Sequence, residues 1–427
     1  MSIARLHTIV CFCLAGSMAL SWLPAQELSP TDPESAGMSR GRLERIDRLM
    51  QQFVDQGNFP GMTVAVARHG RLVYHRSFGY ADLDTQRPVD QSTIFRIYSM
   101  SKPITAVAAL TLWEEGLYQL DDPVSKYLPE LKGLKVYGET EASGTDSSRR
   151  EMTIRDLFRH TSGLGYGWEE GPVDELYKKI NLFDPTTTLA QAVAKLKDLP
   201  LYFAPGTAWH YGVSIDVLGR LIEVWSGLSL DEFFQKRLFD PLSMGDTGFF
   251  ITDDQLPRLT SLYRLDEKTG KMETLPPAYS VDAYRKDKNR LLSGGGGLVS
   301  TTSDYLRFAQ MLARGGELDG VRILGPRTVE LMASDHLPEG VSMSWDKLRG
   351  HGYGLGVSVL LDPPASLSVG SPGDFGWDGA ASTYVRIDPV EDLVVLLMTH
   401  RMPCDTEIQV KLKTLVYQAL TDEPRGK

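Results

Sequence analysis

The stretch FRIYSMSK, residues 95–102, contains a serine and a lysine three positions apart at the start of an apolar segment. The segment from Ser99 to Glu115 is expected to be a helix, because Pro103 falls in its first turn, where proline is tolerated. On a helix this spacing places the lysine ammonium on the same face as the serine hydroxyl. A buried lysine with a depressed pKa can accept the serine proton, and the helix N-terminus favours the developing negative charge. Ser99 is therefore the candidate nucleophile, and Lys102 is its candidate base.

The same spacing occurs a second time, at Ser344 and Lys347, in a polar stretch that precedes an expected strand. Ser344 does not begin an apolar helix, so the helix argument made for Ser99 does not apply to it. The pattern is short and also arises by chance, which means that the assignment of Ser99 depends on the residues around it.

The chain has the composition of a globular protein, with 427 residues of which 42% are apolar and 23% are charged. This length corresponds to two or three structural units, or to one large enzyme body with an insertion. The chain has 45 Lys and Arg against 55 Asp and Glu, for a formal net charge of −10. No nucleic-acid partner is expected, because phosphate binding depends on clustered cations. The sequence indicates no particular oligomeric state.

Residues 1–25 have the layout of a secretory signal peptide. Arg5 precedes an apolar run from Ile9 to Leu20, and small residues follow as far as Ala25. We expect export to the periplasm or the extracellular space; the alternative is a retained N-terminal anchor. No apolar stretch reaches the roughly 18 residues that a membrane-spanning helix needs, so no span is expected in the mature chain.

Two of the three cysteines, Cys11 and Cys13, lie in this leader, and Cys404 is alone in the rest of the chain. No intrachain disulfide is therefore expected, even in an oxidising compartment. No histidine-rich setting surrounds Cys404, so a catalytic thiol is not expected there.

Strand-like segments lie near both ends of the chain, and the middle is mainly helical. The expected strands are Thr63–Arg68, Arg71–Phe78, Tyr353–Leu361, Thr383–Ile387 and Leu393–Thr399. The last of them has no polar alternation and should be buried on both faces. Further helices are expected at Thr153–His160, Leu189–Leu199, Ile215–Ser226, Ser303–Arg314 and Glu407–Leu420.

This order of elements predicts an α/β fold of the α+β type, formed by residues 38–421. One sheet would be built from both ends of the chain, from about residues 38–100 and 290–421. Residues 101–289 would form an inserted, mostly helical subdomain, with a cleft between the two parts.

Several catalytic signatures are absent from the sequence, and each absence argues against a class of function. There is no G-x-S-x-G elbow, no H-E-x-x-H and no P-loop, and the eight histidines are scattered. The glycine run at residues 294–297 lacks the strand-to-helix setting of a dinucleotide site. We expect neither a metal nor an organic cofactor.

Six segments carry a resemblance that covers essentially the whole chain after the leader. They are FRIYSMSK (95–102), LDDPV (120–124), LFRHTSGL (157–164), PGTAWHY (205–211), residues 293–303 and GWDGA (376–380). In this order they resemble the serine β-lactamase and penicillin-binding-protein superfamily, most of all its class C branch, which includes the family VIII carboxylesterases. The resemblance runs from about Ser39 to Leu420 and implies a β-lactamase/transpeptidase-like fold, with a mainly antiparallel sheet flanked by helices.

The resemblance also implies a role for individual residues. Ser99 is similar to the family's nucleophile and Lys102 to its partner base. Tyr211 matches the tyrosine of the Tyr-x-Asn motif, whose phenol relays protons to the leaving group and to water. The backbone N–H of Ala380 would form the oxyanion hole together with that of Ser99. His210 is interpreted as a neighbour of the site and not as a participant.

Departures from the family's pattern concern the substrate. Val213 stands where Tyr-x-Asn has its amide. Trp377-Asp378-Gly379 stands in place of the Lys-Thr-Gly strand, whose cation attracts the carboxylate of a β-lactam or a D-Ala peptide. Since Trp377 removes that cation and Asp378 adds a negative charge, anionic substrates should bind less well.

A literal Lys-Thr-Gly triplet does occur, at Lys268-Thr269-Gly270. It is flanked by short strand-like runs and is expected to be a hairpin turn. It also precedes the glycine run at 294–297, whereas the family's triplet strand follows it, so we place it outside the site.

Together these features predict an exported serine hydrolase, most of all a carboxylesterase that acts on a small, neutral ester through an acyl-enzyme on Ser99. Residues 377–379 and Val213 would contact the substrate. The alternatives are a D,D-carboxypeptidase or D-amino-acid peptidase, a weak β-lactamase, and a transesterase. A non-catalytic scaffold of the penicillin-binding type is a hypothesis from another class. The joint presence of Ser99, Lys102 and Tyr211 argues against it.

Overall fold

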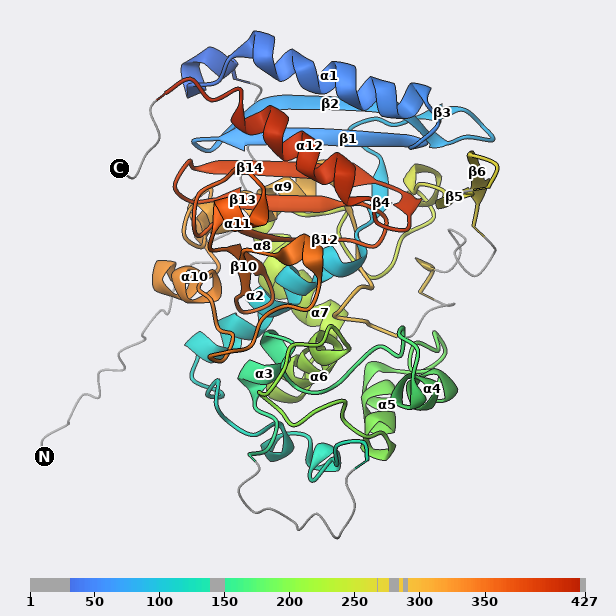
Figure 1. Ribbon diagram of the computed structural model, residues 1–427, viewed down its shortest axis with the longest axis vertical. Helices are drawn as coiled ribbons and strands as arrows, with labels where there is room; N and C mark the ends of the chain where they lie inside the picture. Colours follow the sequence, from blue (N-terminus) through green and yellow to red (C-terminus); the bar gives the residue numbers. More distant parts are fainter. Residues whose placement is uncertain (1–30, 139–149, 267, 276–283, 287–290, 423–427) are drawn as a thin grey trace, which may run out of the picture.

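An antiparallel sheet of eight strands forms the upper half of the protein in the computed structural model (Figure 1), which describes residues 31–138, 150–266, 268–275, 284–286 and 291–422. The predicted leader lies outside these residues. The sheet has the order β10-β11-β12-β13-β14-β1-β2-β3, so a strand from the C-terminal part, β14, pairs directly with β1. Its strands are β1 (Gly61–Arg68), β2 (Arg71–Asp82), β3 (Arg87–Pro88), β10 (His351–Tyr353), β11 (Ser358–Leu360), β12 (Phe375–Asp378), β13 (Tyr384–Asp388) and β14 (Leu393–Thr399). The predicted fold class is confirmed.

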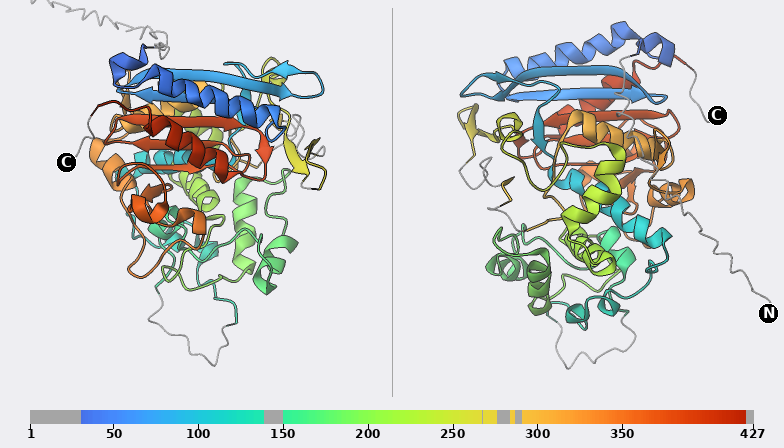
Figure 2. Two further views of the ribbon diagram at one scale, coloured as in Figure 1. Left: turned by 45° about the horizontal axis from the view of Figure 1, so that its top comes forward. Right: turned by 180° about the vertical axis from the view of Figure 1, so that it is seen from behind.

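Helices cover both faces of this sheet, and the burial of β14 follows from that. Alternate residues of β14 belong to two separate apolar clusters. On one face they pack with α1 (Arg40–Asp55) and α12 (Thr406–Tyr417). On the other they join the main core with α2 (Ser101–Glu114) and α9 (Thr302–Ala313). In the right-hand view of Figure 2, which shows the molecule from behind, α9 lies in front of the sheet. Since successive side chains of a strand point to opposite faces, a strand between two layers of helices needs apolar residues at every position.

The expected strand Tyr353–Leu361 is wrong as a single element. Residues 351–353 form β10 and residues 358–360 form β11, and the two pair with each other. Between them Gly356 has a φ of +83°, and the amide of Gly354 donates to the carbonyl of Val357. The turn is hidden in the sequence because glycine, and not a cluster of polar residues, makes it.

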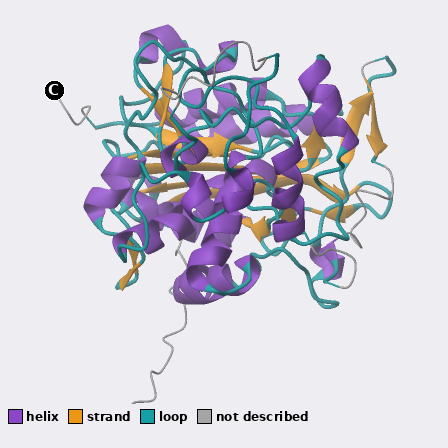
Figure 3. Cartoon of the chain, turned by 90° about the horizontal axis from the view of Figure 1, so that it is seen from below, coloured by secondary structure: helices purple, strands orange, loops and turns teal. Residues whose placement is uncertain are grey.

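The segment between α2 and the glycine run at 294–297 is mainly helical, and most of its helices lie in the lower half of the molecule in Figure 1. Seen from below, helices and loops lie in front of the sheet (Figure 3). Its helices are α3 (Ile154–Phe158), α4 (Pro172–Lys179), α5 (Leu189–Ala194), α6 (Ser214–Ser226), α7 (Leu230–Phe234) and α8 (Asp240–Leu242). It also contains a hairpin of β5 (Tyr263–Asp266) and β6 (Lys271–Thr274), which pairs with β15 (Arg401–Met402). The triplet Lys268-Thr269-Gly270 lies in the turn of this hairpin, as predicted. Short elements between α9 and β12 are β8 (Glu317–Leu318), β9 (Val321–Arg322), α10 (Pro326–Met332) and α11 (Pro363–Ser366).

A separate two-stranded ladder carries the chain toward Ser99. It consists of β4 (Ile94–Arg96), which ends just before Ser99, and β7 (Val299–Thr301), which follows the glycine run. The two segments that hold the candidate nucleophile and the glycine run are therefore fixed to each other by backbone hydrogen bonds. Within the part of the chain that the structure describes, no helix is both long and apolar enough to cross a bilayer.

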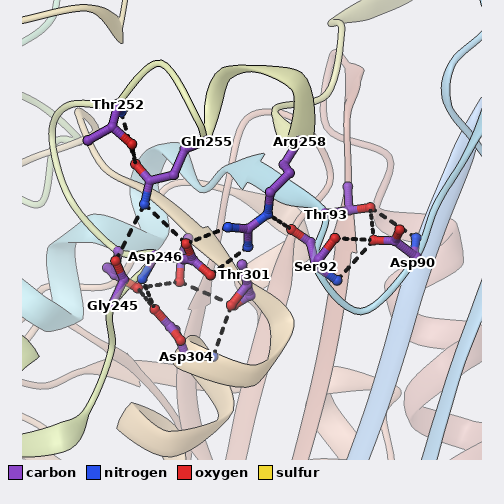
Figure 4. A network of polar contacts seen from close by, with 12 residues as sticks. Asp90, Ser92, Thr93, Gly245, Asp246, Thr252, Gln255, Arg258, Thr301 and Asp304 are labelled. Carbon is purple, nitrogen blue, oxygen red and sulfur yellow. Dashed lines mark hydrogen bonds and ion pairs between the residues drawn. The ribbon is translucent and has the colours of Figure 1, made fainter.

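A polar network supports this ladder from outside (Figure 4). The guanidinium of Arg258 binds both carboxylate oxygens of Asp246, at 2.8 and 2.5 Å, and donates to the carbonyl of Ser92 at 2.9 Å. The amide of Asp246 donates to Asp304, in the first turn of α9, at 2.8 Å. These contacts join the loop before β4, the loop after α8 and the start of α9.

Candidate active site

Ser99 lies in a single 3₁₀ turn, Tyr98–Met100, between β4 and α2. The helix expected from Ser99 onward begins at Ser101 instead. Tyr98 has a φ of +44°, a left-handed conformation that is uncommon for a large side chain and that occurs at strained functional sites. Ser99 is half-buried, and Lys102 is fully buried. Ser99 is therefore partly open to solvent, whereas Lys102 beside it is not.

Lys102 lies in the first turn of α2 and contacts Ser99. Its Nζ is 3.1 Å from Ser99 Oγ and donates to the carbonyl oxygen of Gly295 at 2.7 Å. Burial lowers the pKa of Lys102 to about 7, although the charges of Asp216 and Asp378 oppose this change. Near neutral pH a large fraction of the amine is therefore uncharged and able to accept a proton from Ser99.

Asp216, in α6, is a site residue that the sequence analysis missed. Its Oδ1 accepts hydrogen bonds from the Ser293 hydroxyl at 2.5 Å and from the Gly295 amide at 3.1 Å. It thereby fixes the glycine run whose carbonyl holds Lys102. Burial raises the pKa of Asp216, and the Ser293 hydroxyl and the Lys102 charge oppose this. In the sequence, Asp216 could have been recognised as an acidic residue in the otherwise apolar start of α6, shortly after Tyr211.

Tyr211 completes a hydrogen-bonded group around Ser99. Its hydroxyl accepts a hydrogen bond from Trp377 Nε1 at 3.0 Å, and the nearby Ser99 side chain lowers the pKa of the phenol. The ring centre is 4.5 Å from Lys102 Nζ. Burial raises the pKa of Tyr211 well above its usual range, so the phenol stays protonated at neutral pH. Lys102 is therefore the group that can accept a proton at neutral pH, whereas Tyr211 keeps its own proton and can pass one on only while it takes up another.

Aromatic side chains from separate segments form one wall of the site. The main cluster comprises Trp209, Tyr211, Met343, Tyr353 and Trp377. Trp345 packs against it, with its ring 5.0 Å from that of Tyr211. At the outer edge the exposed Trp168 stacks on Tyr166 at 4.2 Å. Such walls favour apolar, weakly hydrated ligands.

The end of β12 lies against the segment that carries Ser99. A Cβ added at Gly379 would come within 2.5 Å of the carbonyl oxygen of Ile97, so only glycine permits this approach. The turn after β12 is closed by hydrogen bonds from Gly379 to Thr383 and from Ser382 to Gly379, neither of which uses the amide of Ala380. The amide of Ser99 is in the first turn of its helix, where N–H groups lack intrahelical partners. The two amides that the resemblance assigns to the oxyanion hole thus come from adjoining segments.

Asp378 does not stand as an isolated negative charge. Its Oδ2 accepts a hydrogen bond from Lys347 Nζ at 2.8 Å, and the thiol of Cys404 contacts the same oxygen. The negative charge that the sequence places at Asp378 is therefore paired with a lysine from another segment. Lys347 belongs to the second S-x-x-K pattern. Contacts between such distant residues leave no mark in the local sequence.

Val213 is placed away from the substrate side of the site. It is fully buried in the main apolar core, at the start of α6. A bound substrate would not reach its side chain in this arrangement, so the expected contact is not present.

Other titratable groups near the site do not favour acid–base chemistry. His210 stacks on Tyr202 at 4.2 Å, and burial lowers its pKa. His160 is buried 4.8 Å from the Tyr211 ring, and burial together with the Lys102 charge lowers its pKa well below the usual range. Burial raises the pKa of Cys404 to about 12, so the thiolate is scarce. Among the residues described, no group of three His, Cys, Asp or Glu side chains is arranged to hold a metal ion.

Comparison with known proteins identifies the chain's relatives. The family model described as Beta-lactamase matches residues 46–415. Protein Rv1367c of Mycobacterium tuberculosis (strain ATCC 25618 / H37Rv) is 34% identical over 373 residues, which cover 83% of this chain and 89% of that protein. Esterase EstB of Burkholderia gladioli is 31% identical over 392 residues, which cover 86% and 93%.

A solved structure agrees with these relatives. The protein EstCE1, described as a hydrolase with promiscuous acyltransferase activity, superposes with a TM-score of 0.77 at 27% sequence identity. The match covers 88% of this chain and 99% of that one. The similarity therefore extends over the sheet and the helical part alike.

Proposed function

The chain belongs to the beta-lactamase family and is a serine hydrolase, and from this premise we propose that it cleaves neutral carboxylic esters through an acyl-enzyme on Ser99. The observation that carries the proposal is the 3.1 Å contact between Ser99 Oγ and Lys102 Nζ, with a Lys102 pKa of about 7. Acyl transfer requires a nucleophile in hydrogen-bond contact with a base, and the base works best when its pKa lies near the working pH.

In the acylation step, neutral Lys102 accepts the Ser99 proton while Ser99 Oγ attacks the ester carbonyl carbon. The amides of Ser99 and Ala380 bind the oxyanion of the tetrahedral intermediate. When the carbon–oxygen bond to the alcohol breaks, Tyr211 gives its proton to the leaving oxygen and regains one from the Lys102 ammonium. The alcohol leaves, and the acyl group stays on Ser99.

Deacylation reverses these roles with water as the nucleophile. A water molecule attacks the acyl carbon while its proton passes through Tyr211 to neutral Lys102. As the bond between the acyl carbon and Ser99 Oγ breaks, the Lys102 ammonium returns a proton to Ser99 Oγ. The products are the carboxylic acid and the free enzyme. No step requires a metal or an organic cofactor.

The preference for neutral esters rests on the end of β12. Trp377 is committed to Tyr211 through its indole N–H, and Lys347 is committed to Asp378. Trp377 offers a substrate carboxylate no positive charge, the cation beside it is already paired with Asp378, and the aromatic wall favours apolar groups.

Acyl transfer to an alcohol other than water is a second candidate function. Its support is the stacked pair of Tyr166 and exposed Trp168 next to Tyr211, a surface on which an apolar alcohol can bind. The relative EstCE1 is described as having promiscuous acyltransferase activity. Adding an alcohol to the ester assay and measuring the new ester tests this.

The test of the main proposal compares p-nitrophenyl esters, a chromogenic cephalosporin and D-Ala peptides at equal enzyme concentration. Labelling of Ser99 by a phosphonate, followed by mass spectrometry, identifies the nucleophile. Turnover of the esters with labelling of Ser99 supports the proposal. Turnover of the cephalosporin at an efficiency equal to that of p-nitrophenyl acetate would replace it with the β-lactamase alternative.

We also propose that the protein is exported, on the basis of residues 1–25 alone. The mature enzyme would then work in the periplasm or outside the cell. Cys404 would have no partner for a disulfide there, since it is the only cysteine after the leader.

A further inference from the structure

Lys347 lies beside β12, near the place where the sequence lacks its expected cation. Its Nζ is 2.8 Å from Asp378 Oδ2 and 5.1 Å from the centre of the Trp345 ring. Trp345 in turn lies 5.0 Å from the ring of Tyr211. A positive charge is thus brought next to β12 from the short 3₁₀ helix Asp346–Leu348, and not from β12 itself. Lys347 lies 31 positions before Asp378 in the chain.

The pair of Lys347 and Asp378 is accessible to solvent. Burial opposes the charge of Lys347, but Asp378 together with Cys404 more than offsets this and raises the pKa of Lys347. The side chains are 33% and 20% exposed. Water and solutes therefore reach the pair, so that its partners can be exchanged without opening the apolar core.

The charge of Asp378 also affects the pKa values of Lys102 and Tyr211. Its charge opposes the lowering of the Lys102 pKa and contributes to the raising of the Tyr211 pKa. Asp378 immediately precedes Gly379 and Ala380, whose segment adjoins Ser99. The ion pair is thus within electrostatic reach of a substrate bound at Ser99.

The geometry points to a masked cation, by which we mean that the ammonium of Lys347 is already bound by the carboxylate of Asp378. This pair makes the site select uncharged esters over esters that carry a carboxylate. A substrate carboxylate has to displace Asp378 before it can bind Lys347, whereas an uncharged substrate leaves the pair intact. The inference rests on the proposed esterase function and specifies the substrate class of the same site.

The experiment uses two aryl esters with the same leaving group, p-nitrophenyl butyrate and the anionic p-nitrophenyl hemisuccinate. The measured quantity is the ratio of their kcat/KM values within each variant, so that effects on Ser99 and Lys102 cancel. In Asp378→Asn the freed Lys347 should raise the anionic-to-neutral ratio about tenfold over wild type. In Lys347→Met the exposed Asp378 charge should lower the ratio below that of wild type.

The double variant Asp378→Asn with Lys347→Met decides whether Lys347 is the group that binds the carboxylate. The ratio should return to near the wild-type value, because both charges are gone. An equal rise in the single and the double variant would show that loss of negative charge alone is responsible and would overturn the inference. An unchanged ratio in a folded Asp378→Asn variant, as judged by its thermal unfolding, would also overturn it.

Binding of phenylboronic acid and 3-carboxyphenylboronic acid, which add reversibly to a serine hydroxyl, separates this inference from the esterase proposal. If wild type turns over neither ester, the proposed function fails. The masked cation still predicts that Asp378→Asn improves the Kd of the carboxylated boronate relative to the plain one. Equal Kd ratios in wild type and variant would overturn the masked cation whether or not the esters are turned over.

Discussion

Ser99 and Ser344 have the same relation to a following lysine in the sequence, but their surroundings differ. Ser99 contacts a fully buried amine, whereas Ser344 is exposed in a loop and its partner Lys347 is bound to Asp378. We expect Ser99→Ala to abolish ester turnover and phosphonate labelling. Ser344→Ala should retain both at near wild-type level. Activity that survives in the Ser99 variant, measured on purified protein, would contradict the assignment.

The pKa of Lys102 predicts the acid limb of the pH profile. Lys102 is protonated below a pH of about 7 and cannot accept the Ser99 proton. We expect kcat/KM to fall about tenfold for each pH unit below this value and to level off above it. Asp216→Asn should move the limb to lower pH, because the Asp216 charge opposes the lowering of the Lys102 pKa. Lys102→Arg is the control, since arginine stays charged and should be inactive at every pH.

The role of Trp377 differs from that of the cation it replaces. Its indole N–H donates to the Tyr211 hydroxyl, so in the proposed mechanism Trp377 would orient the phenol and would not bind a substrate anion. A change to lysine would remove this donor. A gain in anionic substrate binding is better sought at Asp378, where a lysine is already present.

Among the elements, α9 carries a pH-sensitive group at its start. Burial raises the pKa of Asp304 to about 6, although hydrogen bonds from Asp246 and Thr247 oppose this. Since the folded pKa exceeds the unfolded value, its contribution to stability is complete below a pH of about 4 and is lost as the pH rises through about 6. A shift of about 2 units corresponds to roughly 3 kcal/mol.

The measurement compares the free energy of unfolding of wild type and Asp304→Asn between pH 4 and pH 7. The wild-type value should decline relative to that of the variant across this window. The difference between the two proteins isolates this group from other titrations. A difference that is independent of pH would contradict the raised pKa of Asp304.

At the scale of the whole molecule, the proposed preference for neutral esters depends on a site assembled from both halves of the chain. A charge-assisted hydrogen bond to a carboxylate is worth roughly 1.5–3 kcal/mol, so its absence lowers anionic binding by about ten- to a hundredfold. We expect short-chain neutral esters to have a kcat/KM higher than that of β-lactams or D-Ala-D-Ala peptides by at least this factor. Steady-state kinetics on all three classes measure it, with Ser99→Ala as the background control.

The maturation of the chain is also open to test. If residues 1–25 are a leader, the N-terminus of the exported protein should lie between about Leu20 and Glu27. Intact-mass spectrometry of the exported protein measures this, and a retained Met1 would contradict cleavage. Reductant should leave the Tm unchanged, because Cys404 has no intrachain partner.

Local patterns were sufficient for much of the fold. The unbroken apolar run at 393–399 correctly indicated a strand buried on both faces, because a strand's own residues record which of its faces are covered. The turn at Gly356 was missed because it lies within a largely apolar segment, so no change in polarity marks it in the sequence. The start of α2 was placed two residues early, because the turn at Tyr98 depends on contacts with distant segments.

The sequence by itself determined the class of fold and the proximity of Ser99 to Lys102, since both depend on neighbours within one turn or one strand. The assignment of catalytic roles to Ser99, Lys102 and Tyr211 stays a prediction. Only the tertiary structure decided that Gly295 holds Lys102 from 193 positions away and that Trp377 bonds Tyr211 from 166 positions away. It also decided that Lys347 neutralises Asp378. Such pairs are set by the order of strands in the sheet and the path of the loops, and no short window of sequence records which distant segments the sheet places side by side.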